Sequence, residues 1–251
     1  MDNKITVVVC SRESDDEKKL FLEHLKDTCG YNVHVMFLVN KDGISLSKIY
    51  SEMIKKIETD IIVFIHDDIE FLKKGWGGEI VSLFENNKDY GIIGIAGSSE
   101  FNNNGAWWTN KKIYGQLLHR NEGKTWLTAY SNLLDKGKLK EVCVVDGVLI
   151  AVNKNRISKN FDIDFNGFHH YDTSFCISNY IDGKCKIGVT TDIRIAHNSI
   201  GMLNQSWHDN LIKLNSKFDK YFPLDTEADK DRREKDNTLK ENNKWIQNYK
   251  S

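Results

Sequence analysis

The chain has 251 residues, of which 40% are hydrophobic and 28% are charged, and its formal net charge is −1. This length and hydrophobic content favour one large core in a single elaborated domain over two small domains. The nearly balanced charge excludes a global field that would hold the protein on nucleic acid or on an anionic membrane. We therefore expect no nucleic-acid partner and at most peripheral membrane contact, and we leave a homo-oligomer open.

We expect no signal peptide and no membrane-spanning segment from these residues. The apolar stretch Ile5–Cys10 is too short for the hydrophobic region of a signal peptide, and no other run approaches the roughly 20 residues of a membrane span. The five cysteines are scattered and form no Cys-x-x-Cys pair, which favours buried thiols in a reducing compartment. These features predict a cytoplasmic protein.

Strand and helix signals alternate through the first half of the chain, a pattern that predicts parallel strands with helices packed on them. Ser14 and Glu17 have the spacing of a capping box, which marks the start of the first helix. In chain order, the predicted elements are strand Ile5–Val9, a helix with Leu20, Phe21, His24 and Leu25 on its buried face, strand Val33–Val39, a helix with Ile49, Met53, Ile54 and Ile57 on its buried face, strand Ile61–Ile65, a helix near Trp76–Phe84 and strand Gly91–Ile95.

The middle of the chain is less regular. Residues 97–140 are rich in Asn, Gly and Trp and too long for an idle connection, so we expect a functional excursion with some structure of its own. A long strand is predicted over Val142–Val152, interrupted at Asp146-Gly147 by a bulge or by a close approach of the backbone to a neighbour. The elements predicted after it are helix Tyr171–Tyr180, strand Lys186–Val189 and an extended segment Asp192–Ala196 that ends beside His197.

The C-terminal part consists of two segments that differ in composition. Apolar residues at helical spacing predict a helix that packs on the core, whereas the composition beyond Pro223 is almost wholly charged and amidic. We predict one domain over residues 1–223 and a charged helix or tail over residues 224–251. The apolar residues of the helix are Trp207, Leu211, Leu214, Phe218, Tyr221 and Phe222, and those that could dock the tail are Trp245, Ile246 and Tyr249.

The strongest chemical signal is His66-Asp67-Asp68, which directly follows the strand Ile61–Ile65. Open α/β sheets bind ligands at the carboxyl ends of their strands. Carboxylates placed there are costly unless a cation or hydrogen-bond donors compensate them, and a hard divalent ion is the natural compensation. From the local pattern alone, a solvated turn explains the acidic pair equally well.

Five segments in a fixed order give this signal a context. They are Val7–Arg12, Phe64–Ile69, Val145–Gly147, His170–Asp172 and His197. Together they resemble glycosyltransferases of the GT-A fold, and most closely an inverting family-two-like branch in which histidine replaces the first aspartate of the Asp-x-Asp motif. The resemblance implies an α/β fold with a Rossmann-like central mixed, mostly parallel sheet, flanking helices and a C-terminal helical extension. It does not cover Thr226–Ser251.

The resemblance also implies a metal site. Asp68 stands where the last acid of the motif ligates Mn²⁺ or Mg²⁺ that bridges the donor diphosphate. His197 resembles a late histidine that completes the coordination, and its alternative is a hydrogen-bonded histidine at the start of a loop. Asp67 is placed among the donor-binding residues. His66 is placed there too, and its contact could be with the metal, with the ribose or only with the protein.

Asp172 resembles the catalytic base of the family. A carboxylate within hydrogen-bond reach can take the proton of an acceptor hydroxyl as its oxygen attacks the anomeric carbon, and attack opposite the diphosphate inverts the configuration. The structural alternative is that Asp172 is the N-cap of the following helix. Both roles can coexist, because a helix N-terminus would help to keep the carboxylate ionised.

Further positions are assigned to the donor by the same resemblance. Ser11 and Arg12 resemble the nucleotide-facing turn, and Asp42 could reach the base or the ribose. Asp146 could bind a sugar hydroxyl and Gly147 would leave room for the sugar ring. Their structural alternatives are turn capping, a surface ion pair and a bulge in a buried strand.

Trp107, Trp108 and Trp126 fall in the excursion that could close over the acceptor, and flat aromatic rings stack well on sugars. We select Trp108 as the sugar-binding candidate, against the alternative that such residues anchor loops. His169 and His170 could contact phosphate or acceptor, or simply be exposed on their loop.

The expected activity is metal-dependent transfer of a hexosyl or N-acetylhexosaminyl group from a UDP-sugar to a saccharide or glycoconjugate, as in polysaccharide biosynthesis. Two alternatives stay open. A metal-dependent phosphoesterase could use the same acid and histidine cluster, although a second tight acid-histidine motif near the N-terminus is lacking. A binding scaffold could keep the fold and bind nucleotide sugars without turnover.

Overall fold

The computed structural model describes residues 5–227. Its central sheet has seven strands: β1 (Ile5–Ser11), β2 (Val33–Val39), β3 (Ile61–Ile65), β5 (Tyr90–Gly94), β10 (Lys140–Val142), β12 (Leu149–Asn153) and β13 (Lys186–Val189). Their order is β10-β13-β5-β12-β3-β1-β2. Strands β2, β1, β3, β5 and β13 run in one direction and β12 and β10 run in the other. The predicted central sheet, mixed and mostly parallel, is confirmed.

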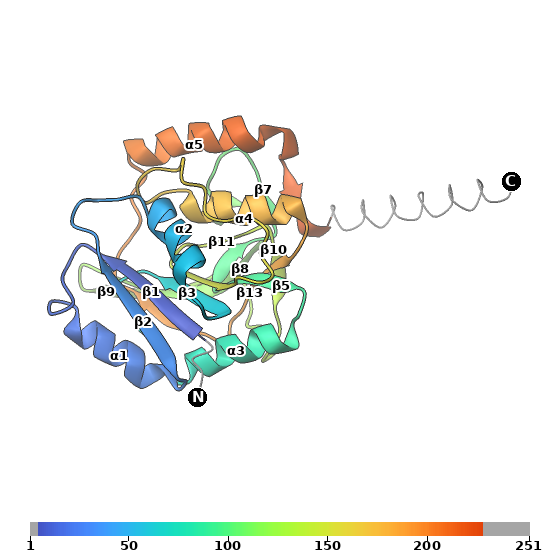
Figure 1. The fold of residues 1–251 in the computed structure, drawn as a ribbon. Helices are drawn as coiled ribbons and strands as arrows, with labels where there is room; N and C mark the ends of the chain where they lie inside the picture. Colours follow the sequence, from blue (N-terminus) through green and yellow to red (C-terminus); the bar gives the residue numbers. More distant parts are fainter. Residues whose placement is uncertain (1–4, 228–251) are drawn as a thin grey trace, which may run out of the picture.

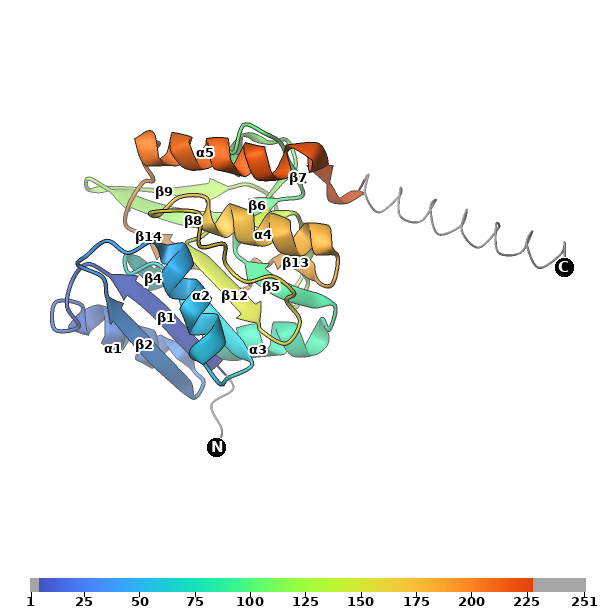
Figure 2. The same ribbon diagram turned by 45° about the horizontal axis from the view of Figure 1, so that its top comes forward.

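Helices cover both faces of this sheet. They are α1 (Lys19–Cys29), α2 (Leu46–Lys56), α3 (Trp76–Asn86), α4 (Tyr171–Asp182) and α5 (Gln205–Phe218). Helices α1 and α3 lie on one face and α2 and α4 on the other, with α5 outside α4 (Figure 1 and Figure 2). Along β1, Val7 and Val9 pack with the first pair while Val8 packs with the second, because successive strand residues face opposite sides. Among residues 5–227, no helix has the length and apolarity that a membrane crossing requires.

A second sheet arises largely from the excursion. Its strands are β4 (Ile69–Phe71), β6 (Ala96–Ser98), β8 (Ile113–Asn121), β9 (Lys124–Ala129), β11 (Val144–Val145) and β14 (Ile195–His197). Their order is β11-β6-β8-β14-β4, with β9 paired to β8. Two short 3-10 helices, Trp107–Thr109 and Asp219–Tyr221, and a two-stranded pair of β7 (Glu100–Phe101) with β15 (Leu224–Asp225) complete the fold. The excursion therefore has structure of its own, as expected.

The long strand predicted over Val142–Val152 is wrong. This stretch contains the end of β10, then β11 in the second sheet, then β12 in the central sheet. The chain leaves one sheet for the other at Asp146, whose carboxylate accepts a hydrogen bond from the Val148 backbone N–H at 2.9 Å. In such a turn the aspartate side chain takes the place of a partner strand as the hydrogen-bond acceptor of a backbone N–H. The apolar run therefore does not continue as one strand.

The first helix differs from its prediction in two details. The capping box is present, since Ser14 N–H donates to the Glu17 carboxylate at 2.7 Å and Glu17 N–H donates to Ser14 Oγ at 3.3 Å. It closes a turn before α1, which begins at Lys19. Leu20, predicted on the buried face, is 81% exposed, whereas Leu25 is fully buried. The buried face of α1 is therefore formed by Leu25, Thr28 and Cys29.

The C-terminal helix packs as predicted through Trp207, Leu214 and Phe218, which are buried, while Tyr221 is 40% exposed. The chain beyond it stays on the domain at first. Leu224 pairs with Phe101 in the β7–β15 ladder, and Asp225 accepts a bond from Lys112 Nζ at 2.9 Å. The first residues of the predicted tail are therefore part of the folded body. The other tail residues, with Trp245, Ile246 and Tyr249, lie outside the described residues.

The aromatic centre of the core gives a stability prediction. Phe64 on β3 is fully buried, with its ring centroid 4.3 Å from that of Tyr50 and 5.2 Å from that of Phe161. Phe64→Ala should lower the free energy of unfolding by about 3–5 kcal/mol, because the cavity cannot collapse fully. In urea denaturation the exposed control Leu20→Ala should stay within about 0.5 kcal/mol of the native protein. Equal losses in both variants would contradict this packing.

Candidate functional site

Backbone pairing brings the two halves of the site together. Strand β3 ends at Ile65 and β4 begins at Ile69, so residues 66–68 form the turn between them. The last residue of β14, His197, pairs with Ile69, and the next residue, Asn198, donates its N–H to the Asp68 carbonyl at 2.9 Å. These bonds place His197 beside Asp68 although the two are distant in the sequence.

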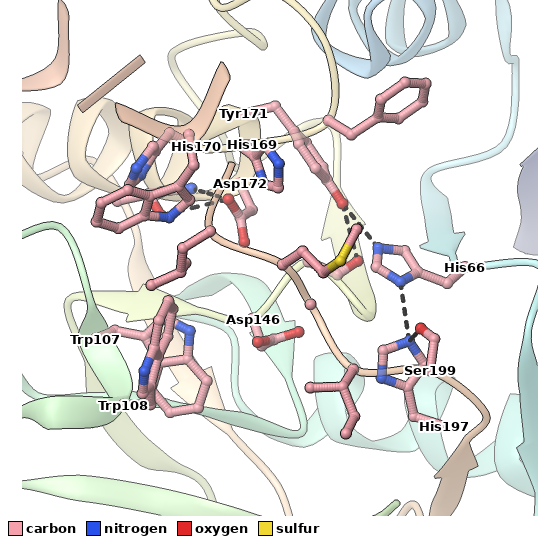
Figure 3. Close-up of a pocket in the computed structure, with 18 of the residues that line it drawn as sticks. His66, Trp107, Trp108, Asp146, His169, His170, Tyr171, Asp172, His197 and Ser199 are labelled. Atoms are coloured by element: carbon pink, nitrogen blue, oxygen red, sulfur yellow. Dashed lines mark hydrogen bonds between the residues drawn. The ribbon is translucent and has the colours of Figure 1, made fainter. Parts of the chain in front are cut away.

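Three ligand atoms converge at this point. His66 Nδ1 lies 3.4 Å from His197 Nε2 (Figure 3). The same His197 nitrogen lies 3.2 Å from Asp68 Oδ1. The ligand atoms of all three residues lie within 4.8 Å of one another. Asp68 Oδ1 is buried and accepts no hydrogen bond of good geometry in the described structure. Two imidazoles and an unsatisfied carboxylate oxygen fit a divalent cation, and imidazole ligands favour Mn²⁺ over Ca²⁺.

Tyr171 sets the orientation of His66. The Tyr171 hydroxyl donates to the Gly147 carbonyl at 3.2 Å and lies 3.2 Å from His66 Nε2. Because the hydroxyl proton is used, this network assigns the imidazole proton to Nε2, which leaves the lone pair on Nδ1 facing the cluster. Outer partners of this kind fix the tautomer and direction of a ligating histidine.

The pKa values of Asp68 and His197 shift in opposite directions, as expected for an ionised carboxylate beside a protonated imidazole. Burial by itself would raise the pKa of Asp68, but the close contact with His197 at 3.2 Å and the charge of that ring lower it well below its usual range. Burial by itself would lower the pKa of His197, and the Asp68 carboxylate outweighs it and raises that pKa. Burial and the charge of His197 lower the pKa of His66. A divalent ion must displace the proton held between Asp68 and His197, so its affinity should rise with pH.

A first cavity of about 440 Å³ opens on one side of the cluster. Ser11, Arg12, His66 and Asp67 all line it. The Ser11 hydroxyl donates to the Asp67 carboxylate, and Lys18 Nζ donates to the Asp67 carbonyl at 3.1 Å. The predicted donor-binding residues at the ends of β1 and β3 are thus brought together. Arg12 and Lys18 line this cavity together with the carboxylates of Glu13, Asp67 and Asp68.

Asp42 is the predicted donor residue that the structure brings to neither of the two cavities at the cluster. It is exposed on the turn before α2, and it lines neither cavity described here. Asn40 lines the first cavity instead. Its side chain accepts from Ile44 N–H at 2.8 Å and donates to the Ile44 carbonyl at 2.7 Å, which closes the turn and directs Asp42 into solvent.

A second cavity of about 550 Å³ lies on the other side of the cluster. It is lined by the remaining site candidates Trp108, Asp146, Gly147 and Asp172. His66 and Phe168 line both cavities, and His197 lines the second. The two cavities therefore meet at the cluster of possible metal ligands. Trp126 lies outside this lining, and its ring stacks on His119 with centroids 5.2 Å apart.

Asp172 faces the second cavity from the first turn of α4. Its carboxylate accepts from Thr173 N–H at 2.7 Å, and the N-cap of the helix is His170, so the N-cap alternative for Asp172 is wrong. Burial and the nearby charge of Asp146 raise the pKa of Asp172 to about 7. The Thr173 N–H in the first turn of the helix lowers this pKa, in the direction expected, but burial and the charge of Asp146 outweigh it.

Neighbouring side chains leave no room for any side chain larger than that of glycine at position 147. A Cβ there would lie 2.3 Å from the Tyr171 hydroxyl and 3.1 Å from Asp172 Oδ2. Gly147→Ala should therefore lower the free energy of unfolding by about 1–3 kcal/mol and weaken Mn²⁺ binding, because Tyr171 must move away from His66. Thermal unfolding with and without Mn²⁺ measures both effects. Gly78→Ala on α3, where the nearest atom would be 3.9 Å away, is the control and should not destabilise.

Tyr171, Lys18 and Asn40 are the site residues that sequence reasoning misses. Tyr171 directly precedes the predicted base Asp172, so the sequence indicates that it is near the site. The sequence does not indicate the direction of its ring. Lys18 and Asn40 are single polar residues near strand ends, where many such residues are solvated. Only the fold shows that they line the first cavity.

Comparisons with known proteins concern the fold and the family of the chain. No curated protein matches the chain. Among solved structures, GalNAc-T7 with UDP, GalNAc and Mn²⁺ is similar over 85% of this chain, with a TM-score of 0.52 and 9% identity. The chain spans 48% of that protein, about half its length. The A197 protein from STIV is similar over 78% of this chain and 86% of its own, with a TM-score of 0.44 and 10% identity.

The fold is therefore the GT-A fold, which the likeness to GalNAc-T7 shows by its shape rather than by its sequence. The match to a family model rests on the sequence and not on the shape of the fold. Residues 6–217, which include every predicted site residue from Ser11 to His197, match the glycosyltransferase-like family. On this match over most of its length, the chain belongs to that glycosyltransferase-like family.

Proposed function

We propose that the chain is a metal-dependent glycosyltransferase that moves a hexosyl or N-acetylhexosaminyl group from a UDP-sugar to a hydroxyl of a saccharide or glycoconjugate, with inversion. One observation carries the proposal. The ligand atoms of His66, Asp68 and His197 lie within 4.8 Å of one another where the two cavities meet. This arrangement suits a donor on one side and an acceptor on the other.

The first cavity would hold the nucleoside diphosphate. His66, Asp68 and His197 would ligate Mn²⁺ or Mg²⁺, which when bound acts as a Lewis acid for the charge that develops on the leaving diphosphate. Ser11 and Asp67 would bind the nucleoside, and Arg12 the diphosphate. The structure of GalNAc-T7, which has the same fold, contains UDP and Mn²⁺ and supports this choice of ligand and ion.

The second cavity would hold the sugars that react. The acceptor oxygen attacks the anomeric carbon and forms the new C–O bond as the bond from that carbon to the diphosphate oxygen breaks. Asp172 takes the acceptor proton, and Asp146 holds a hydroxyl of the donor sugar. Attack from the face opposite the diphosphate inverts the configuration, through a transition state of oxocarbenium character.

The raised pKa of Asp172 predicts a pH dependence. Only the ionised carboxylate can accept the acceptor proton, and its fraction grows as pH rises through about 7. At saturating Mn²⁺, kcat should therefore increase between pH 6 and 8 and then level off. Initial rates across this range measure the effect, with the Mn²⁺ concentration doubled as a control for metal loading. A kcat that falls over the same range would contradict a base at Asp172.

Ligand-dependent thermal unfolding tests the proposed function against its alternatives. UDP should raise the Tm only with Mn²⁺ or Mg²⁺ present, and a ligand at 100 times its Kd stabilises by about 2.7 kcal/mol. UDP-sugars should also be consumed, by transfer or by slow hydrolysis. A rise in Tm with UDP, but no consumption of UDP-sugars, would indicate a binding scaffold. Cleavage of p-nitrophenyl phosphate, with no rise in Tm when UDP is added, would indicate a phosphoesterase.

A further inference from the structure

His170 is held in a costly state. It is the N-cap of α4 with a left-handed φ of 58°, and it is only 4% exposed. Its Nε2 is buried and has no hydrogen-bond partner in the described structure. The backbone conformation costs about 1–2 kcal/mol, and a buried unpaired polar atom costs about 1–3 kcal/mol. Two such costs at one residue that lines a cavity indicate that a ligand supplies the missing partner.

The surroundings of His170 hold its ring in place. The ring centroid lies 4.9 Å from that of Trp207. On another side, a Cβ built on Gly105 would lie 3.0 Å from His170 Cε1, so the backbone there approaches closely. The His170 carbonyl accepts from Ser174 N–H at 2.9 Å and anchors the first turn of the helix. With backbone and ring both fixed, the side chain cannot swing away to find another partner.

The position of His170 assigns it to the acceptor. His66 and His197 lie at one end of the second cavity, His170 lies toward the other end, and Asp172 and Asp146 lie between them (Figure 3). Under the proposed function, the donor sugar lies at the metal end and the attacking hydroxyl contacts Asp172. The part of a ligand that lies beyond Asp172 therefore belongs to the acceptor.

The charges of the second cavity restrict that acceptor. Among the described residues, none that lines the second cavity is a lysine or arginine, whereas Asp146 and Asp172 line it. Burial and the charge of His169 lower the pKa of His170 to about 4, so its ring is neutral at pH 7. The indoles of Trp107, Trp108 and Trp207 form apolar walls. An acidic sugar bound beyond Asp172, away from the metal end, would meet negative charge with no lysine or arginine to compensate it.

We propose that the acceptor is an uncharged sugar and that His170 Nε2 hydrogen-bonds one of its hydroxyls. A hydroxyl both donates and accepts, so it satisfies the ring nitrogen in either tautomer of the neutral imidazole. The nearby indoles can stack on the apolar face of the sugar ring. This inference rests on the proposed function and names the substrate class of its acceptor side.

Saturation-transfer NMR with UDP and diamagnetic Mg²⁺ present tests the inference. The probes are the methyl glycosides of glucose, galactose and N-acetylglucosamine, their monodeoxy analogues, and methyl glucuronide. The native protein should bind at least one neutral glycoside, and should bind one of its deoxy analogues about 10-fold more weakly because the ring nitrogen is then left unpaired. Methyl glucuronide should bind more weakly than methyl glucoside.

Two variants remove the His170 contact without disturbing the backbone. Glycine and asparagine both tolerate the left-handed conformation, so His170→Gly and His170→Asn should fold. In His170→Gly the discrimination against the deoxy analogue should disappear, and in His170→Asn it should weaken, because a shorter amide replaces the ring nitrogen. UDP binding should be unchanged in both. His208→Asn is the control, because His208 contacts the Trp207 ring with centroids 5.0 Å apart but is exposed and lines neither cavity.

Three results would overturn the inference: the same deoxy discrimination in the native protein and in both His170 variants, glucuronide binding as tight as glucoside binding, or no binding of any neutral glycoside. UDP binding in the same samples reports separately on the proposed function. A native protein that binds the glycosides but no UDP would overturn the transferase proposal through its donor side. A native protein that binds UDP but shows no role for His170 would overturn the acceptor inference alone.

Discussion

Replacement of Asp172 by asparagine is expected to lower the transfer rate by about 10²- to 10⁴-fold, the usual contribution of a positioned general base. The amide keeps the shape of the side chain but cannot take the acceptor proton. UDP binding with Mn²⁺ should be nearly unchanged, because Asp172 lies outside the metal cluster and does not line the first cavity. Transfer assays and UDP titrations measure the two effects on the same preparation.

The same variant should be more stable than the native protein at neutral and higher pH. The pKa of Asp172 is raised to about 7, so its ionised form is disfavoured in the folded state. The native protein therefore loses stability as pH rises from about 4, the ordinary aspartate pKa, to about 7, and the loss is complete above that range. The Tm advantage of Asp172→Asn should be absent near pH 4, grow to about pH 7 and then stay constant.

Asp182→Asn, at the exposed end of the same helix, is the matched control and should leave the transfer rate unchanged. Undiminished transfer by Asp172→Asn would remove Asp172 from the role of base. A Tm advantage that is largest at pH 4 would contradict the raised pKa.

Asp68→Asn should weaken Mn²⁺ binding by more than the 10- to 100-fold that loss of an outer partner costs, because Asp68 offers a direct ligand. It should also abolish the stabilisation by UDP that depends on Mn²⁺. The amide oxygen is a poorer, uncharged ligand, and it leaves His197 without its carboxylate partner at 3.2 Å. Isothermal titration with Mn²⁺, and thermal unfolding with UDP, measure both losses.

Asp42→Asn is the control for this experiment. Asp42 is exposed and lines neither cavity, so its replacement should change neither Mn²⁺ nor UDP binding. If the two variants lost UDP binding equally, the donor site would extend over the turn before α2. If Asp68→Asn kept full Mn²⁺ affinity, the cation would bind elsewhere.

The first half of the fold could be predicted because its signals are local. The buried strand Ile61–Ile65 is a continuous apolar run, and the apolar residues Ile49 and Met53 of α2 and its C-cap residue Ile57 recur at helical spacing. In contrast, the division of Val142–Val152 between two sheets depends on partners remote in the sequence, such as the pairing of Val144 with Ser98. No periodicity within the segment reports such pairing.

The site was predictable in part for the same reason. Asp68 stands out because carboxylates follow a buried strand, but its meeting with His197 depends on the pairing of β14 with β4. The resemblance to a family supplied that link. The sequence leaves the role of His66 open, because the bond of its Nε2 with Tyr171, which directs Nδ1 at the cluster, is a matter of side-chain direction. His170 shows its missing partner only once its burial is known.

A crystal structure of the protein grown with Mn²⁺ and UDP, with anomalous scattering used to locate the ion, tests the central claim most directly. We predict a single strong anomalous peak bound by His66 Nδ1, Asp68 Oδ1 and His197 Nε2, with the diphosphate of UDP on the same ion and the nucleoside in the first cavity. An ion bound at other side chains, or UDP bound away from this cluster, would contradict the account.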